Sequence, residues 1–221
     1  AELHSNPDCN IVLNLPMVLF GSKELPLILS DESINEVLIS EAEQTYTFKR
    51  HDPLVAWMDS NSKNVGENRK IFYSALQKDV VESVKSSLAE LGATLIGVRT
   101  SLSSTINALY FSGATSEQMQ DGVAWNLLIV GLGGYSICSM LGTKIVDYYE
   151  EPLALKSFDS SEIYNAISSS VQLSLMNYPA NYTYVVSDTD LVSAEILASR
   201  MSGVVGVTGF LENNFYRKET F

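Results

Sequence analysis

Hydrophobic and polar positions along this chain form short apolar runs that alternate with amphipathic segments. Apolar runs bounded by turn-forming residues predict strands. They lie at 11–15, 18–20, 54–57, 70–75, 93–98, 125–130, 135–141, 144–149, 182–187 and 204–208. Apolar residues at helical spacing predict helices that begin near Ser30, Val80, Thr100, Asp159 and Leu191. Helices joined to strands by tight links are typical of an α/β layer, so we expect an α/β fold.

Several local signals fix where these elements begin and end. Asp159, followed three residues later by Glu162, predicts a reciprocal capping box at the start of a long helix. Gly92 predicts the end of the helix before it, and the segment 141–144 predicts a hairpin turn. Residues 213–221 are expected to form a weakly ordered or partner-bound tail.

The pattern of strands followed by helix, strand and helix occurs in each half of the chain, which suggests two related α/β lobes. The polar segment 112–121 contains turn formers and has little to bury, so we expect the boundary there. The first lobe is therefore expected over residues 1–115 and the second over residues 120–221.

Composition narrows the possible partners. The 221 residues include 14 Lys and Arg against 26 Asp and Glu, a net charge of −12. This charge opposes binding to nucleic acid and to anionic lipid, whereas basic partners remain possible. No apolar run of the length that spans a bilayer is present, so we expect no membrane span within this chain. The two cysteines, Cys9 and Cys138, favour a reducing compartment.

Few residues offer catalytic or metal-binding chemistry. His4 and His51 are the only histidines and neither has a Cys or His at ligand spacing, so neither a metal site nor a Ser-His-Asp triad is expected. The acidic groups at 159–162 and 188–190 fall at predicted helix starts, where capping explains them. Gly131, Gly133 and Gly134 could bind phosphate through their amides, but tight hairpin geometry is the favoured explanation.

Three segments carry a resemblance to a known family. Residues 41–48, Glu-Ala-Glu-Gln-Thr-Tyr-Thr-Phe, resemble a helix end that typically reads Glu-Ala-Glu-Gln, an aromatic, Ile, Pro, Phe. Residues 75–109 resemble that family's helix, strand and following helix, and residues 128–151 resemble its second phosphate-loop hairpin, with Gly142 at the turn. The family is that of the cytoplasmic actin-like proteins of type IV pilus and type II secretion platforms, the PilM and GspL type. The resemblance implies an actin-like, ribonuclease H-like two-lobed α/β fold with a small inserted subdomain over about residues 20–75 of the first lobe.

The sequence differs from the family at positions that the family uses to bind a nucleotide. Actin-like ATPases hold Mg·ATP with an Asp-containing loop in each lobe. Gly131 stands where the family usually has that Asp, and the chain begins near the family's second strand, so the first phosphate loop is missing from it. The segment 187–190 replaces a run of glycines, and its two carboxylates would repel a nucleotide. The resemblance therefore implies a degenerate fold that is not an enzyme and holds no cofactor or metal.

The resemblance also implies a role and partners. We expect a non-enzymatic scaffold at the cytoplasmic face of the bacterial inner membrane, linking the cytoplasmic assembly ATPase to platform subunits of the PilN or GspM kind. Membrane association is expected to be indirect, or through a segment absent from this chain. In the family the inserted subdomain receives a neighbouring platform protein, which makes Glu41, Glu43, Tyr46 and Phe48 candidate partner contacts. A solvated helix end with one buried aromatic residue remains the alternative.

Two enzymatic alternatives stay open. A nucleotide-responsive actin-like ATPase, with its first phosphate loop missing from this chain, would bind Mg·ATP once that loop is restored. A small-molecule kinase of the same broad fold would need a catalytic Asp near the end of the first lobe. Thr100 and Ser101 stand there instead, which argues against the kinase.

Overall fold

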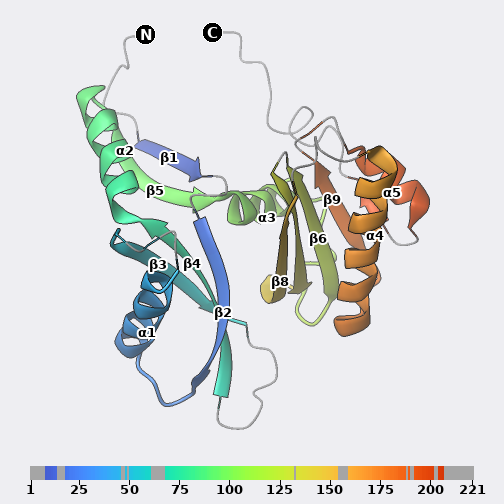
Figure 1. Cartoon of the computed structure of the whole chain (residues 1–221), viewed down its shortest axis with the longest axis horizontal. Coiled ribbons are helices and arrows are strands. Elements are labelled where there is room, and N and C mark those ends of the chain that lie inside the picture. The colour runs from blue at the N-terminus through green and yellow to red at the C-terminus, as the bar shows by residue number, and fades with distance from the viewer. Residues whose placement is uncertain are drawn as a thin grey trace. The chain divides into compact units, whose positions relative to one another are not determined.

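The computed structural model describes residues 8–13, 18–45, 48, 50–60, 68–131, 133–153, 159–187, 189, 192–201 and 204–206. Contacts divide the chain into two compact units, Ala1–Asn107 and Ala108–Phe221, which are described here one at a time (Figure 1). The division falls inside helix α3, Ser101–Phe111, whereas the sequence pattern placed it in the polar segment that follows.

Unit 1 contains a three-stranded antiparallel sheet covered by one helix. The strands lie in the order β2 (Val18–Pro26), β4 (Asn68–Gln77), β3 (Pro53–Asp59). Helix α1 (Asp31–Glu43) packs on this sheet because its apolar stripe is buried there. The stripe, Ile34 and Leu38, joins Leu25, Ile71 and Tyr73 in one cluster. The prediction of a strand that ends at residue 20 was wrong, because β2 continues through Gly21 in unbroken register with β4.

A second, two-stranded sheet completes the described part of unit 1. Strand β1 (Asp8–Leu13) pairs in parallel with β5 (Thr94–Thr100), and helix α2 (Lys78–Glu90) precedes β5. Gly92 adopts φ +74° after α2, a conformation that favours glycine, which confirms the predicted helix end. The hydroxyl of Thr100 accepts a hydrogen bond of 3.1 Å from the backbone N–H of Ser103 at the start of α3.

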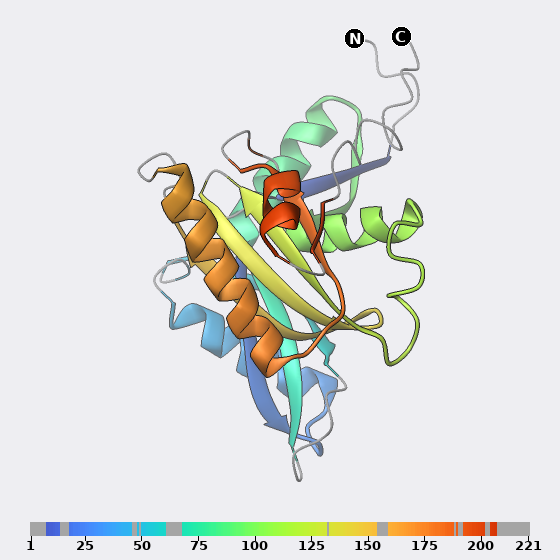
Figure 2. The ribbon, with the colours of Figure 1, turned by 90° about the vertical axis from the view of Figure 1, so that its right-hand side faces the viewer.

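Unit 2 is a five-stranded mixed sheet with two helices. Its elements are β6 (Ala124–Gly131), β7 (Gly134–Leu141), β8 (Lys144–Pro152), α4 (Ser160–Asn177), β9 (Thr183–Ser187), α5 (Ala194–Arg200) and β10 (Val204–Gly206). The strand order is β10-β9-β6-β7-β8, with β10, β9 and β6 parallel and β7 antiparallel to both neighbours. Helix α4 crosses one face of this sheet (Figure 2). Its Ile163, Ile167 and Val171 belong to one buried cluster with Leu128 and Ile137 of the strands.

The capping box at α4 is confirmed. The Asp159 carboxylate accepts a hydrogen bond of 2.9 Å from the Glu162 N–H, and the Glu162 carboxylate accepts one of 3.2 Å from the Asp159 N–H. The β7–β8 hairpin turn is also confirmed, since Gly142 adopts φ +59° and its carbonyl accepts from the Trp125 indole at 2.8 Å. The capping box and the turn could be predicted from the sequence because each depends on residues that are close together in it.

The predicted start of α5 was wrong. Ser193 is the N-cap, and its hydroxyl accepts a hydrogen bond of 3.3 Å from the Ile196 N–H. The helix therefore begins at Ala194, with Ser193 at the N-cap position. Asp188, Asp190 and the tail 213–221 lie outside the described residues.

Cys138 lies in the interior of unit 2. It is fully buried, and its Sγ lies 3.4 Å from the Met140 Sδ. Burial raises the pKa of the thiol far above its ordinary value, with a smaller contribution from the charge of Asp147. Cys138 therefore behaves as a small apolar core residue. Within the described ranges, no helix combines the length and apolar character that a membrane crossing requires.

Candidate functional site

A capping residue sets the start of helix α1, and its buried stripe holds it against the sheet. Ser30 caps the start by accepting from the Ser33 N–H at 3.3 Å, and Asp31 and Glu32 in the first turn suit the positive end of the helix dipole. The last turn holds no basic residue. Because one stripe is buried against the sheet, the residues between these positions form a second, outward face.

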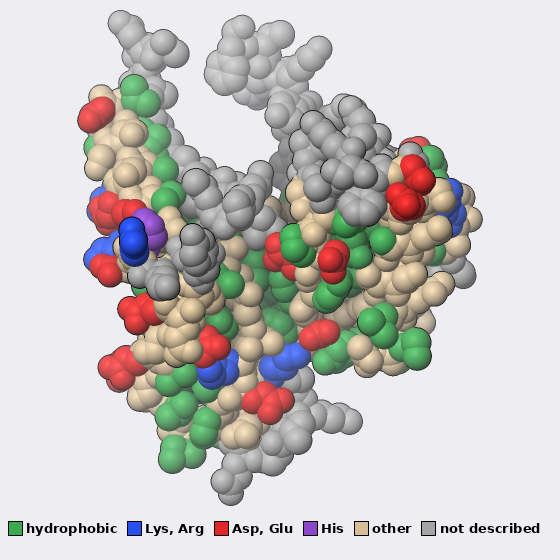
Figure 3. All heavy atoms as spheres, viewed as in Figure 1, with side chains coloured by type: hydrophobic (Ala, Val, Ile, Leu, Met, Phe, Trp, Pro, Cys, Tyr) green, Lys and Arg blue, Asp and Glu red, His purple; other side chains and the backbone are tan. Residues whose placement is uncertain are grey.

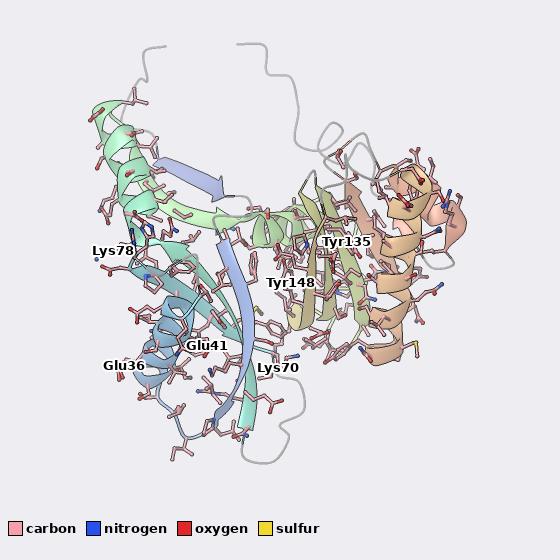
Figure 4. All side chains as sticks on the ribbon, in the orientation of Figure 1. Glu36, Glu41, Lys70, Lys78, Tyr135 and Tyr148 are labelled. Atoms are coloured by element: carbon pink, nitrogen blue, oxygen red, sulfur yellow. The ribbon has the colours of Figure 1, made fainter. Side chains whose placement is uncertain are left out.

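This outward face and strand β2 enclose a shallow hollow of about 290 Å³, which we call the α1–β2 hollow. Its lining comes from both elements: Lys23, Glu36, Val37, Ser40, Glu41 and Gln44. The Lys23 Nζ donates to the Glu41 carboxylate, which ties the helix to β2. Figure 4 labels Glu36 and Glu41 on α1. The hollow thus combines one aliphatic side chain with two carboxylates and one amine.

Negative side chains outnumber positive ones in and around the hollow. The ammonium of Lys23 compensates one of the two lining carboxylates, and Glu43 adds another exposed carboxylate at the end of the helix. The phenol of Tyr73 has a raised pKa, mainly because it is buried and secondarily because of the charge of Glu41. The hollow is therefore a net acidic site that suits a cationic group.

The four residues proposed for partner contact have different positions. Glu41 lines the hollow, whereas Glu43 is exposed on the last turn of α1 outside it. Phe48 is only 1% exposed and packs with Ala42 and Ala75, so its side chain is not on the surface. Tyr46 lies outside the described residues. The structure thus brings one of the described candidates into the hollow.

Sequence reasoning missed the other lining residues. Val37 and Gln44 share one side of α1 with Glu41 through steps of four and three residues, so helical spacing from Glu41 could have found them. Lys23 could not have been found this way, because it comes from β2, and its position beside α1 depends on tertiary packing.

The glycines between β6 and β7 serve close packing. Gly131 pairs with Gly134 across the hairpin, and Leu132 lies outside the described residues. Gly134 adopts φ +144°, and a Cβ there would lie 2.1 Å from the carbonyl oxygen of Glu151. The N–H of Leu153 also donates to the Gly133 carbonyl at 3.0 Å. The end of β8 therefore occupies the space that a Cβ at Gly134 would need.

The packing of β8 against Gly134 bears on whether this hairpin could hold a phosphate. A phosphate cradle needs open space in front of glycine amides. At Gly134 that space holds backbone atoms of Glu151 and Leu153. Glu150 and Glu151 pair with Ser136 and Tyr135 in the register of β8 and β7, and carboxylates at these positions repel phosphate. Close packing thus accounts for the glycine at position 134.

His51 forms a side-chain hydrogen bond with Asp79. Its Nδ1 lies 2.9 Å from the Asp79 carboxylate at the start of α2. In the part of the chain that the structure describes, no three His, Cys, Asp or Glu side chains gather as metal ligands would.

Comparisons with known proteins identify the fold. No protein-family model and no curated protein sequence matches this chain. Among solved structures, the chain is similar to the "PilM-PilN type IV pilus biogenesis complex", with a TM-score of 0.63 and 16% identity over 92% of this chain and 70% of that one. The expected actin-like α/β fold is confirmed.

Two further solved structures match with lower TM-scores. One is a Bacteroides thetaiotaomicron protein with an actin-like ATPase fold and unknown function, with a TM-score of 0.46 and 13% identity over 86% of this chain and 63% of that one. The other is the ethanolamine utilization protein EutJ from Carboxydothermus hydrogenoformans, with a TM-score of 0.37 and 16% identity over 57% of this chain and 54% of that one.

Proposed function

We propose that this protein is a non-enzymatic scaffold of the inner-membrane assembly platform of a type IV pilus. In this proposal it works at the cytoplasmic face of the membrane and binds a PilN-like subunit in the α1–β2 hollow. The observation that carries the proposal is the similarity of fold to the PilM-PilN complex, which extends over 92% of this chain. A link to the assembly ATPase, and a corresponding role in type II secretion, belong to the same proposal.

The chemistry of the hollow supports a basic segment as its ligand. Glu36 and Glu41 attract Lys or Arg side chains, and the partly buried Val37 in the lining suits the aliphatic stem of such a side chain. Acidic residues at a shallow site also speed the approach of a basic partner. A basic segment next to a membrane anchor would have the required charge.

The absence of enzymatic activity is part of the proposal. It is supported by the backbone of β8, which occupies the Cβ side of Gly134, and by the carboxylates of β8. A scaffold of this kind acts through interface burial, so its effect depends on which surfaces its partners occupy.

The test is calorimetric titration of this protein with a synthetic peptide that carries the cytoplasmic segment of a PilN-like subunit. Glu36→Lys reverses a charge in the hollow, and Ser40→Trp fills it. We expect each variant to weaken binding by about tenfold, a loss of about 1.4 kcal/mol. Glu90→Lys makes the same charge change at an exposed position on α2 and should bind as the wild type does.

The possible outcomes separate the parts of the proposal. If the wild-type protein does not bind the peptide, the platform function is overturned. Binding that is equally strong in Glu36→Lys, Ser40→Trp and Glu90→Lys would move the partner site away from the α1–β2 hollow.

A further inference from the structure

We infer that the core of unit 2 contains a binding site for an ordered water molecule, built around the side-chain amide of Asn126. Asn126 lies in β6, the central strand of the five-stranded sheet, and is 0% exposed. Neither its Nδ2 nor its Oδ1 has a hydrogen-bond partner among the residues that the structure describes. The inference does not depend on the proposed function, because it concerns the interior of unit 2.

The side chain of Asn126 lies on the face of the sheet that α4 covers. Side chains two residues apart in a strand share a face, and Leu128 of β6 belongs to one buried cluster with Ile167 and Val171 of α4. Figure 2 shows α4 crossing this face. An amide buried between sheet and helix has lost its hydrogen bonds to bulk water, so it destabilises the fold unless another group replaces them.

Three hydroxyl groups belong to the same level of the core. In the sheet register Asn126 pairs with Ser139 of β7 and Thr183 of β9, and both of these residues are 2% exposed. Thr183 lies two residues before Val185 of the buried cluster, so it shares the face of Asn126. The hydroxyl of Ser139 lies 3.0 Å from that of Ser174 on α4. We call this set the Asn126 layer: Asn126, Ser139, Ser174 and Thr183.

The two unpartnered atoms of Asn126 define what can bind there. Nδ2 carries two N–H donors and needs an acceptor, whereas Oδ1 is an acceptor and needs a donor. An anion could satisfy only Nδ2, and a cation only Oδ1. Water both donates and accepts, and a buried water typically makes about three hydrogen bonds to polar groups that otherwise lack partners. The chemistry of the amide therefore selects water.

The serine pair gives this water a second anchor. The hydrogen bond between Ser139 and Ser174 uses one of their two hydroxyl hydrogens, because one hydroxyl donates and the other accepts. The second hydrogen and the oxygen lone pairs can bond a water that also contacts Asn126. Such a bridge joins β6 to α4, so polar contacts as well as apolar ones hold the helix on the sheet.

Enclosure and charge also favour a small neutral ligand. The three strand residues of the Asn126 layer are at most 2% exposed, which leaves no room for a larger molecule. Residues 122–143 and 163–187, which supply β6, β7, β9 and all but the first turn of α4, include no Asp, Glu, Lys or Arg. Acidic side chains, red in Figure 3, occur on the surface of both units. Asp147 of β8 is opposite Ser139 in the register, and its carboxylate repels an anion.

Nuclear magnetic resonance of the isotope-labelled full chain tests the inference directly. We expect cross-peaks between water and the side-chain N–H groups of Asn126 that have the sign of a dipolar contact with bound water rather than of chemical exchange. The signals are assigned by their loss in Asn126→Leu. Absence of any dipolar contact between water and this amide in the wild-type protein would overturn the inference.

Thermal unfolding of Asn126→Leu gives a second test. Leucine has a similar volume but removes the amide, so the hydroxyl groups of the Asn126 layer lose the bridge to β6. We expect the melting temperature to fall by at least about 2–4 °C. Asn165→Leu makes the same change at an exposed position of α4, and it should alter neither the melting temperature nor the water contact. An Asn126→Leu variant at least as stable as the wild type would show that the amide is buried without a ligand, and would overturn the inference.

Discussion

The aromatic ring of Tyr73 lies directly over Gly21 in the three-stranded sheet of unit 1. The two residues are cross-strand partners of β4 and β2, and a Cβ at position 21 would lie 2.6 Å from Tyr73 Cε1. Tyr73 is buried in the cluster that α1 covers, so its ring has little room to move. The glycine thus allows the ring to cover β2, an arrangement that compensates for the missing side chain.

This contact predicts the effect of Gly21→Ala. The added methyl group would collide with the ring of Tyr73, and the ring could move only by disturbing the packing of Ile34 and Leu38. Overpacking of this kind costs about 1–3 kcal/mol of unfolding free energy, measurable by urea denaturation. Ser22→Ala, at the exposed neighbouring position of β2, should change stability by no more than about 0.5 kcal/mol. Equal stabilities of the two variants would contradict this account of Gly21.

Gly134→Ala should be more damaging. The position has φ +144°, and a Cβ there would lie 2.1 Å from the Glu151 carbonyl oxygen, a backbone atom that cannot rotate away. We expect a loss of about 3 kcal/mol or more in unfolding free energy. Gly133→Ala is the control, since no atom lies within 4 Å of its Cβ position, and it should cost about 1 kcal/mol or less. A well-tolerated Gly134→Ala would show that the end of β8 does not pack on this turn.

Much of the fold was predictable because its causes are local. The capping box of Asp159 and Glu162, the turn at Gly142 and the end of α2 at Gly92 each depend on a few neighbouring residues. The alternation of strands and helices, read together with the family resemblance, was enough to predict the actin-like α/β fold.

The parts that sequence reasoning missed depend on distant contacts. The length of β2 follows from its pairing with β4, which lies some fifty residues further along the chain. The start of α5 follows from the hydroxyl of Ser193, which accepts from the N–H of Ile196. The α1–β2 hollow needs Lys23 beside Glu41, and no periodicity relates residues on two different elements.

The carboxyl of Glu150 on β8 gives the protein a predicted pH dependence. Burial raises the pKa of this carboxyl, and the hydrogen bond from Tyr148 at 3.0 Å opposes the shift only in part. A carboxyl with a raised pKa in the folded state favours folding when it is protonated. Its contribution is fully present below the unfolded-state pKa and is lost as the pH rises through the folded-state pKa.

Glu150→Gln should therefore raise the melting temperature at pH 7, and the advantage should shrink towards pH 4. The glutamine carbonyl can still accept from Tyr148, so the hydrogen bond is retained. Glu90→Gln, an exposed change on α2, should leave the pH dependence of the melting temperature unaltered. Parallel pH profiles for the wild type and Glu150→Gln would rule out the buried carboxyl as the cause.

Calorimetric titration with Mg·ATP tests the non-enzymatic part of the proposal. We expect no heat of binding even at millimolar nucleotide, because the backbone of β8 packs against Gly134 and the carboxylates of Glu150 and Glu151 repel phosphate. Gly131→Asp restores the acidic residue that the resembled family usually has at this position. It should not restore binding, because the packing of residues 151–153 against Gly134 stays in place. Micromolar binding by the wild-type chain would instead favour the nucleotide-responsive ATPase, and binding by Gly131→Asp alone would show that the missing carboxylate, rather than the packing against Gly134, prevents it.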